Sequence, residues 1–258
     1  MTLSPDVIAC AQLVERADPD RFAATMAAPV SVRAVLFPLY AMNVEVSRAP
    51  WVTQETMIAE MRLQWWRDAV AEIAAGGAVR PHEVVTPLAR AIPAELAPVL
   101  DELVAVRRWD IYKEPFEDQA HFDAYLNASA AGLIWLAARA LGPADETVVR
   151  DYGYAVGVAA WLRAVPELEA RGRIPLLDGT PQGVRNLAQA GLDRLTRARR
   201  NRPAVSKFAR CALLAGWQTE ALLSQAVKEP GRVAHGALGT SPARARTSLI
   251  WQRVTGRF

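Results

Sequence analysis

Three arginines in this sequence, Arg33, Arg67 and Arg163, have side chains suited to binding phosphate. The planar guanidinium group donates two parallel hydrogen bonds to phosphate oxygens, a geometry that lysine cannot reproduce. These arginines could therefore bind a phosphate-bearing ligand. The alternative is that they form ion pairs inside a helical bundle, with carboxylates such as Glu60, Asp68 and Glu167. The residues alone leave both interpretations open.

Other residue types that commonly carry catalysis are scattered along the chain. His82, His121 and His235 lack the spacing of metal ligands, and Cys10 and Cys211 form neither a zinc motif nor a disulfide framework. The sequence contains no glycine-rich phosphate loop and no nucleophile that can be matched with a nearby base. We therefore predict no catalytic residue, no metal ligand and no cofactor, and we expect two reduced, mostly buried thiols.

The elements that must position these arginines are helices. Apolar residues recur at helical spacing, alanine is abundant, and no β-branched alternation indicates a strand. The predicted helices span residues 5–17, 20–26, 31–47, 53–75, 87–91, 94–110, 119–141, 145–164, 180–200, 203–226 and 241–254. Thr53 is the expected N-cap of its helix. Short linkers predict one all-α domain over residues 1–230.

Residues 231–258 are predicted to form a loose linker followed by a basic amphipathic segment. The segment mixes apolar residues with cations, among them Arg244, Arg246, Trp251 and Arg253. A basic amphipathic helix with an aromatic anchor can lie on an anionic membrane. It can equally dock on its own bundle, so these four residues are a candidate membrane or partner surface.

The net charge of +3 is unevenly distributed along the 258 residues. The chain from Arg194 onward carries +11, and the remainder carries −8. Such asymmetry indicates an anionic partner or simply a solvated basic face. The basic run 194–202 lacks the aromatic interleaving of a nucleic-acid site, so no nucleic-acid partner is expected.

The expected location is cytoplasmic, at most peripheral at the inner face of a membrane. The sequence lacks the run of about eighteen apolar residues that a membrane-spanning helix needs. Its first residues show neither the basic nor the apolar region of a secretory signal. Two isolated cysteines fit a reducing compartment.

Two stretches resemble the squalene/phytoene synthase family. The first contains Asp20-Arg21-Phe22, Pro29, Arg33 and the run Leu39-Tyr40-Ala41-Met42, and it is similar to the family's first active-site helix. The second, residues 157–176, is similar to the family's second aspartate-rich motif and the Ala-Arg-x-Gly-Arg-Ile segment after it. In order and spacing the resemblance covers roughly residues 10–225. It implies a single-domain, isoprenoid-synthase-like helical bundle with a central cavity.

The family's enzymes join prenyl diphosphates, using Mg²⁺ ions that two aspartate-rich boxes hold across the cavity. In this chain the first box falls at residues 47–51, where no aspartate stands, and Glu45 lies about 200° away around the helix. Ala164 and Leu168 replace the two aspartates of the second box. Because Mg²⁺ binds through carboxylate oxygens and substrate phosphates, the family mechanism lacks its metal site.

The resemblance then implies which residues line the former cavity. The candidate phosphate- or lipid-contacting residues are Arg33, Tyr40, Asn43, Gln64, Arg67, Arg163, Glu167 and Arg171. We further hypothesise that Trp161 fills space that a prenyl chain would otherwise occupy. Mg²⁺ is expected only if the chain is an active prenyltransferase.

Runs such as 40–45, 61–68 and 108–112 resemble a divergent branch of the family that includes a mitochondrial assembly factor for respiratory complex I. This implies a non-catalytic pseudoenzyme that assists assembly of a membrane respiratory complex or binds a lipid or prenyl ligand. The expected partners are a respiratory-complex subunit or an anionic membrane surface. Two alternatives stay open: a prenyltransferase of squalene or phytoene biosynthesis with an altered site, and an interaction protein of other purpose.

Overall fold

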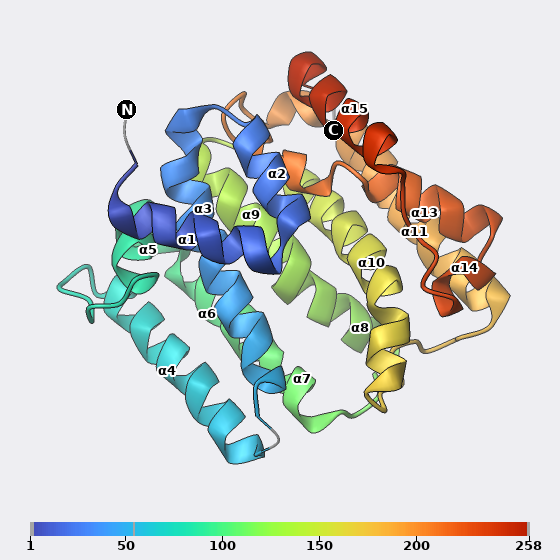
Figure 1. The fold of residues 1–258 in the computed structure, drawn as a ribbon, viewed down its shortest axis with the longest axis horizontal. Helices are drawn as coiled ribbons and strands as arrows, with labels where there is room; N and C mark the ends of the chain where they lie inside the picture. Colours follow the sequence, from blue (N-terminus) through green and yellow to red (C-terminus); the bar gives the residue numbers. More distant parts are fainter. Residues whose placement is uncertain (1–2, 54, 257–258) are drawn as a thin grey trace.

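The computed structural model describes residues 3–53 and 55–256 as a bundle of helices (Figure 1). Its first helices are α1 (Pro5–Ala17), α2 (Pro19–Ala27), α3 (Val30–Arg48), α4 (Thr56–Ala74) and α5 (Val85–Ala91). The middle of the chain forms α6 (Ala97–Ala105), α7 (Trp109–Tyr112), α8 (Gln119–Leu126), α9 (Gly132–Leu141) and α10 (Glu146–Ala170). The last part forms α11 (Pro181–Arg200), α12 (Arg210–Leu213), α13 (Thr219–Lys228), α14 (Gly231–Ala234) and α15 (Pro242–Thr255).

The prediction of an all-α fold is confirmed. Within the described ranges the β pairing amounts to a single bridge between Ala144 and Val205. Helices α3, α9 and α10 lie at the centre, with α4 and α6 on one side and α11 and α13 on the other (Figure 1). Among the described helices, none combines the length and apolar character needed to cross a membrane.

Side-chain caps explain why several helices begin where the sequence predicts. Ser4, Asp18, Asp145 and Thr180 each accept a hydrogen bond from a backbone N–H in the first turn of the helix that follows. Thr53 was expected to do the same, and this prediction is wrong. Helix α4 begins at Thr56, and the Thr53 hydroxyl accepts a hydrogen bond from the N–H of Glu55 instead, at 3.1 Å.

Two helix lengths differ from the expectation. Helix α10 continues to Ala170, six residues beyond the predicted end and through Pro166. The predicted helix over 203–226 is interrupted: α12 is followed by a 3₁₀ turn, Leu214–Gly216, before α13 begins. The Tyr152 hydroxyl of α10 donates a hydrogen bond of 2.6 Å to the Leu213 carbonyl. A side chain that bonds a helix carbonyl from outside is a recognised cause of such breaks.

Helix α10 packs very closely on a π-helical turn, Asn127–Ala131, that joins α8 to α9. A Cβ atom at Gly153 would lie 2.6 Å from the Ala131 Cα atom, and one at Gly157 would lie 2.8 Å from the Ala130 Cβ atom. The two glycines are four residues apart and therefore share one face of α10. Their missing side chains allow the two backbones to approach, which fixes α10 against α8 and α9.

The end of the chain packs on the bundle. Residues 231–239, expected to be a loose linker, include α14, with Val233 buried, and the Gln225 side chain forms two hydrogen bonds with the Gly239 backbone. Helix α15 buries Leu249 and is bonded through Gln252 to the Trp217 carbonyl at 2.8 Å. The C-terminal segment is therefore a docked helix.

Both cysteines are free thiols, as the sequence indicates. Cys10 is buried and Cys211 is half-buried. Burial raises the pKa of the Cys10 thiol to about 12, so this side chain behaves as a small apolar core residue.

We predict that Gly153→Ala destabilises the protein by about 1–3 kcal/mol, because the added methyl group meets backbone atoms that cannot move aside. Urea unfolding measures the change. Gly179→Ala is the matched control, since a Cβ atom there meets no atom within 4 Å. Equal stability of the two variants would contradict the close packing of α10.

Candidate functional site

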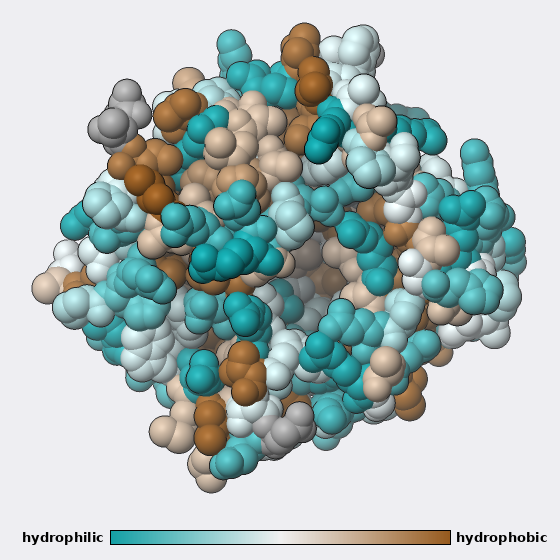
Figure 2. All heavy atoms as spheres, viewed as in Figure 1, coloured by the Kyte–Doolittle hydropathy of each residue, from teal (hydrophilic) through white to brown (hydrophobic). Residues whose placement is uncertain are grey.

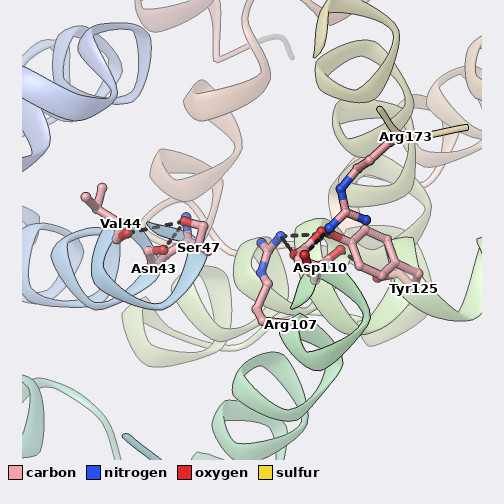
Figure 3. A network of polar contacts seen from close by, with 8 residues as sticks. Asn43, Val44, Ser47, Arg107, Asp110, Tyr125 and Arg173 are labelled. Atoms are coloured by element: carbon pink, nitrogen blue, oxygen red, sulfur yellow. Dashed lines mark hydrogen bonds and ion pairs between the residues drawn. The ribbon is translucent and has the colours of Figure 1, made fainter. Parts of the chain in front are cut away.

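A buried polar network lies between α7, α8 and the loop after α10 (Figure 3). The Asp110 carboxylate accepts hydrogen bonds from the Tyr125 hydroxyl, at 3.1 and 3.0 Å, and from Arg107 at 3.4 Å. Arg107 also donates to the Tyr125 oxygen at 3.0 Å. Arg173 donates from Nη2 to the Asp110 carbonyl. Burial raises the pKa of Asp110, while Arg107 opposes the rise.

Arg173 is the central residue of this network and is only 4% exposed. Its guanidinium carbon lies 4.9 Å from the ring centre of Trp51 and 5.0 Å from that of Trp109, so two indole rings enclose the cation. Burial lowers the pKa of Arg173. A buried guanidinium is costly to keep unless its charge and its N–H groups are satisfied.

Several polar atoms of this network have no hydrogen-bond partner among the described residues. They are Nε and Nη1 of Arg173, Nε of Arg107 and Nε1 of Trp109. All four atoms are donors, and Asp110 supplies the one carboxylate within the network. The arrangement therefore has an excess of positive charge and of donors, which an anion would complement.

A pocket of about 650 Å³ adjoins this network. It is lined by the 3₁₀ turn Ala49–Trp51, the start of α4, the end of α7, Lys113 and Arg171. Trp51 and Asp110 line the pocket and also contact Arg173, so the buried cation lies directly behind its wall. Arg171 stacks on the same Trp51 ring at 4.7 Å. The pocket is large enough for a phosphate-bearing head group.

Aromatic rings fill the interior beside the pocket. Trp109 and Phe116 stack with centres 4.1 Å apart and planes at 8°. Phe122, Tyr125 and Trp161 surround them at centre distances of 5.0 to 5.9 Å. The Trp161 indole is anchored by a hydrogen bond of 2.8 Å to the Pro175 carbonyl. The rings pack into one cluster that joins α7, α8 and α10; that Trp161 takes the place of a prenyl chain stays a hypothesis.

One of the predicted cavity residues lies at this site: Arg171 lines the pocket. Asn43 is buried on α3, with Val44 and Ser47, apart from the Arg107–Asp110 network (Figure 3). Glu167 is close in sequence but turns outward: its side chain is 70% exposed and pairs with Arg171 at 2.6 Å. The site is thus built mainly from residues other than those the sequence singled out.

The remaining predicted residues lie elsewhere, and for two of them the ion-pair alternative describes the contact. Arg67 forms a two-pronged bond with Asp101, at 2.7 and 2.8 Å, which joins α4 to α6. Arg163 pairs with Asp20 of α2 at 2.9 Å. Neither partner is among the carboxylates that the sequence suggested, because helix packing rather than proximity along the chain selects them.

Three more predicted residues are also away from the pocket. Arg33 donates to the Met26 carbonyl at the end of α2, and exposed Gln64 bonds to Asp68 on α4. Tyr40 is buried beneath Arg21, whose guanidinium lies 5.1 Å from the tyrosine ring centre. A smaller pocket of about 110 Å³ lies between α2 and α10 near Arg163, where the viewed face is hollowed (Figure 2).

Sequence reasoning missed Arg107, Trp109, Tyr125 and Trp51, and it left Arg173 outside the candidate set. A signal existed for Arg173, which belongs to the segment that resembles the family's Ala-Arg-x-Gly-Arg-Ile run. Trp51 lies within residues 47–51, the position of the first box, but its contact with Arg173 arises only because the fold brings this 3₁₀ turn onto the loop after α10.

The residues present do not fit a magnesium cluster. Within residues 3–53 and 55–256, no group of three His, Cys, Asp or Glu side chains could hold a metal ion. At the first box position, the Ser47 hydroxyl is bonded within α3, to the carbonyls of Asn43 and Val44. Asp110 is enclosed by Arg107 and Tyr125, and Glu167 is paired with Arg171. Several Mg²⁺ ions need more free carboxylate oxygens than these side chains offer.

The chain belongs to the squalene/phytoene synthase family, whose sequence profile matches residues 14–249. Two solved structures show the same fold. One is a dehydrosqualene synthase in complex with ligand, with a TM-score of 0.78, 15% identity and 97% of each chain covered. The other is a squalene synthase from Alicyclobacillus acidocaldarius, with a TM-score of 0.69, 20% identity and coverage of 87% of this chain and 94% of that one. The predicted isoprenoid-synthase-like bundle is thereby confirmed.

Curated relatives of similar sequence are respiratory assembly factors. The chain is 28% identical over 177 residues to the Drosophila melanogaster homologue of NADH dehydrogenase (ubiquinone) complex I assembly factor 6, covering 65% of this chain and 53% of the relative. It is 24% identical over 178 residues to the Homo sapiens assembly factor 6, covering 64% and 51%. The chain thus spans about half the length of the curated relatives it matches.

We predict that Asp110→Asn costs about 3–5 kcal/mol of stability, because it leaves the buried guanidinium of Arg107 without its anion. Urea unfolding reports the loss. Asp101→Asn is the matched control: it breaks the half-exposed pair with Arg67 and should cost about 1 kcal/mol or less. A similar small loss in both variants would show that the Asp110 network is not a buried ion pair.

Proposed function

We propose that this chain is a non-catalytic member of its family that assists assembly of a membrane respiratory complex. The observation that carries the proposal is the loss of the carboxylates at both box positions: residues 47–51 contain no aspartate, and Ala164 and Leu168 stand where the second pair belongs. Similarity to complex I assembly factor 6 supports the cellular role. The aromatic filling around Trp161 supports the loss of room for two prenyl chains.

The physical argument concerns the leaving group. Loss of diphosphate from an allylic substrate develops charge on the departing oxygens, and a metal ion neutralises that charge. Among the residues that the structure describes, no group of three or more acidic, His or Cys side chains could hold such an ion. Fixed arginines can hold a phosphate in place, but they do not reproduce a cluster of divalent ions.

We further propose that the pocket binds an anionic prenyl or lipid ligand without a metal. Lys113 and Arg171 at the pocket, with Arg173 behind it, would face the phosphate. Lys113 and Arg171 would make the direct contacts, and the buried positive charge of Arg173 behind the wall would add electrostatic attraction for an anion. The ligand's apolar part would lie toward Trp51 and Ile111.

The second candidate function is a prenyltransferase of squalene or phytoene synthesis with an altered site. The likeness of the whole fold to a dehydrosqualene synthase favours it. Fold likeness does not carry chemistry, however, because unrelated activities share one scaffold. The two candidates differ in one measurable product, free pyrophosphate.

We predict that the purified protein releases no pyrophosphate from farnesyl or geranylgeranyl diphosphate in the presence of Mg²⁺, because nothing holds the metal against the leaving group. A coupled pyrophosphate assay measures release, with an active squalene synthase as positive control. Steady release above background would establish the prenyltransferase alternative.

The proposed role in assembly of a respiratory complex is tested by deleting the gene in the source organism. Assembled complex I, followed on native gels, should decrease and should return when the intact gene is restored. Unchanged assembly in the deletion strain would refute the assembly role.

We predict that Arg173→Met weakens metal-free binding of farnesyl diphosphate by on the order of tenfold or more, the loss expected for a charge-assisted hydrogen bond. Quenching of tryptophan fluorescence in the presence of EDTA provides the measurement, since Trp51 and Trp109 touch Arg173. Arg163→Met is the control, because Arg163 lies away from the pocket. Equal affinity in both variants would refute the pocket assignment.

A further inference from the structure

One face of α15 exposes apolar side chains to solvent. Ile250 is 62% exposed, Trp251 is 61% exposed and Val254 is 77% exposed. At about 100° per residue these three side chains fall within an arc of about 100°. Leu249 and Gln252, which hold the helix on the bundle, lie on the other side. The exposed arc is therefore a fixed outward face rather than the fringe of a frayed end.

Cations flank this face. Helix α15 contains three arginines, Arg244, Arg246 and Arg253, and no acidic residue. By the same angular spacing Arg246 and Arg253 lie on one edge of the apolar arc and Arg244 lies on the other. In Figure 2, hydrophobic and hydrophilic atoms lie side by side over α15 at the upper edge of the molecule. An apolar stripe bordered by arginines is the pattern of a helix that lies in a membrane interface.

A groove continues the surface from α15 toward α12. It has a volume of about 650 Å³, and its apolar lining includes Pro29, Phe208 and Val254. Lys207, Arg210 and Arg253 line the same groove and are basic. Phe208 is 54% exposed. Apolar lining with a basic rim suits the acyl chain and the anionic head group of one phospholipid.

Hydrogen bonds to the rest of the bundle hold α15 in its position. Arg253 donates from Nε to the Ala27 carbonyl at 2.9 Å, and Arg202 donates to the Gly256 carbonyl at 3.1 Å. The helix is thus tied to α2 and to the end of α11 as well as to Trp217. It does not need to leave the bundle to present its outward face.

We propose that α15 and the adjoining groove form a docking surface for an anionic phospholipid leaflet. The name α15 surface denotes Ile250, Trp251 and Val254 with Arg244, Arg246 and Arg253. Charge complementarity identifies the occupant, because the helix is purely basic and the chain from Arg194 onward carries +11. A leaflet is favoured over an acidic protein because an exposed apolar stripe bordered by arginines can insert its apolar side chains among lipids while its cations stay at the head groups.

A second exposed apolar stripe provides the internal comparison. Met57 is 73% exposed and Met61 is 65% exposed on α4. Their charged neighbours, Glu60 and Arg62, cancel each other. If exposed apolar side chains were sufficient for lipid binding, both stripes would bind lipid. We expect only the α15 surface to bind, because it also carries a basic border.

The docking surface rests on the proposed function only for its cellular setting, a respiratory membrane. The vesicle experiment does not depend on that function. Full-length protein is sedimented with vesicles of phosphatidylcholine alone or mixed with phosphatidylglycerol. We expect binding only to the mixed vesicles, decreasing as salt is raised because charge attraction is screened. Arg244→Gln combined with Arg246→Gln should weaken binding on the order of tenfold or more.

Apolar variants complete the test. Ile250→Ser, Trp251→Ser and Val254→Ser together should weaken binding on the order of tenfold or more, whereas Met57→Ser with Met61→Ser should leave it unchanged. Circular dichroism establishes that each variant is folded. Equal binding to neutral vesicles, no binding to either kind, or wild-type binding by the triple variant would overturn the proposal. Vesicle binding requires neither a prenyl diphosphate nor a respiratory complex. The vesicle experiment can therefore give a negative result even when the protein releases no pyrophosphate, so the two proposals can fail separately.

Discussion

The structure of the site depends on one enclosed cation. Arg173 is held between the indole rings of Trp51 and Trp109, and it bonds to the carbonyl of Asp110, whose carboxylate is paired with Arg107 and Tyr125. A buried guanidinium is tolerated only where its surroundings compensate its charge. This requirement explains why an aspartate, a tyrosine and two tryptophans from separate segments meet at this point. It also explains the affinity for an anion that we propose.

The rest of the bundle places these segments. The missing side chains of Gly153 and Gly157 bring α10 against the π-helical turn, so that Tyr125 on α8 and Trp161 on α10 enter one ring cluster. The cluster occupies the interior, which leaves the pocket near Trp51 as the space beside the cation. The basic α15 surface lies on a different part of the molecule. The family scaffold thus combines a pocket lined by Lys113 and Arg171 with a basic helix on another part of the molecule.

The sequence predicted the fold well and the site only in part. Helical spacing and capping residues located most helices, since both signals are local. The breaks in 203–226 were not predictable, because the hydroxyl that bonds the Leu213 carbonyl comes from Tyr152, far away in the sequence. The candidate arginines Arg67 and Arg163 were assigned by resemblance, and their partners, Asp101 and Asp20, became evident only from packing. Arg173 lies in a segment that resembles the family. Its contacts with Trp51 and Trp109, however, join three segments that are far apart in the sequence.

The central claim is that the carboxylates that would have to hold a metal cluster are missing from both box positions, while arginines beside the pocket remain. It is tested most directly by crystals grown with Mn²⁺ and a non-hydrolysable farnesyl diphosphate analogue, examined for anomalous scattering. We predict diphosphate density beside Arg171 and Arg173, with no manganese peak between Asn43 on α3 and Glu167 on α10. A group of manganese peaks bridging those two helices would contradict the account.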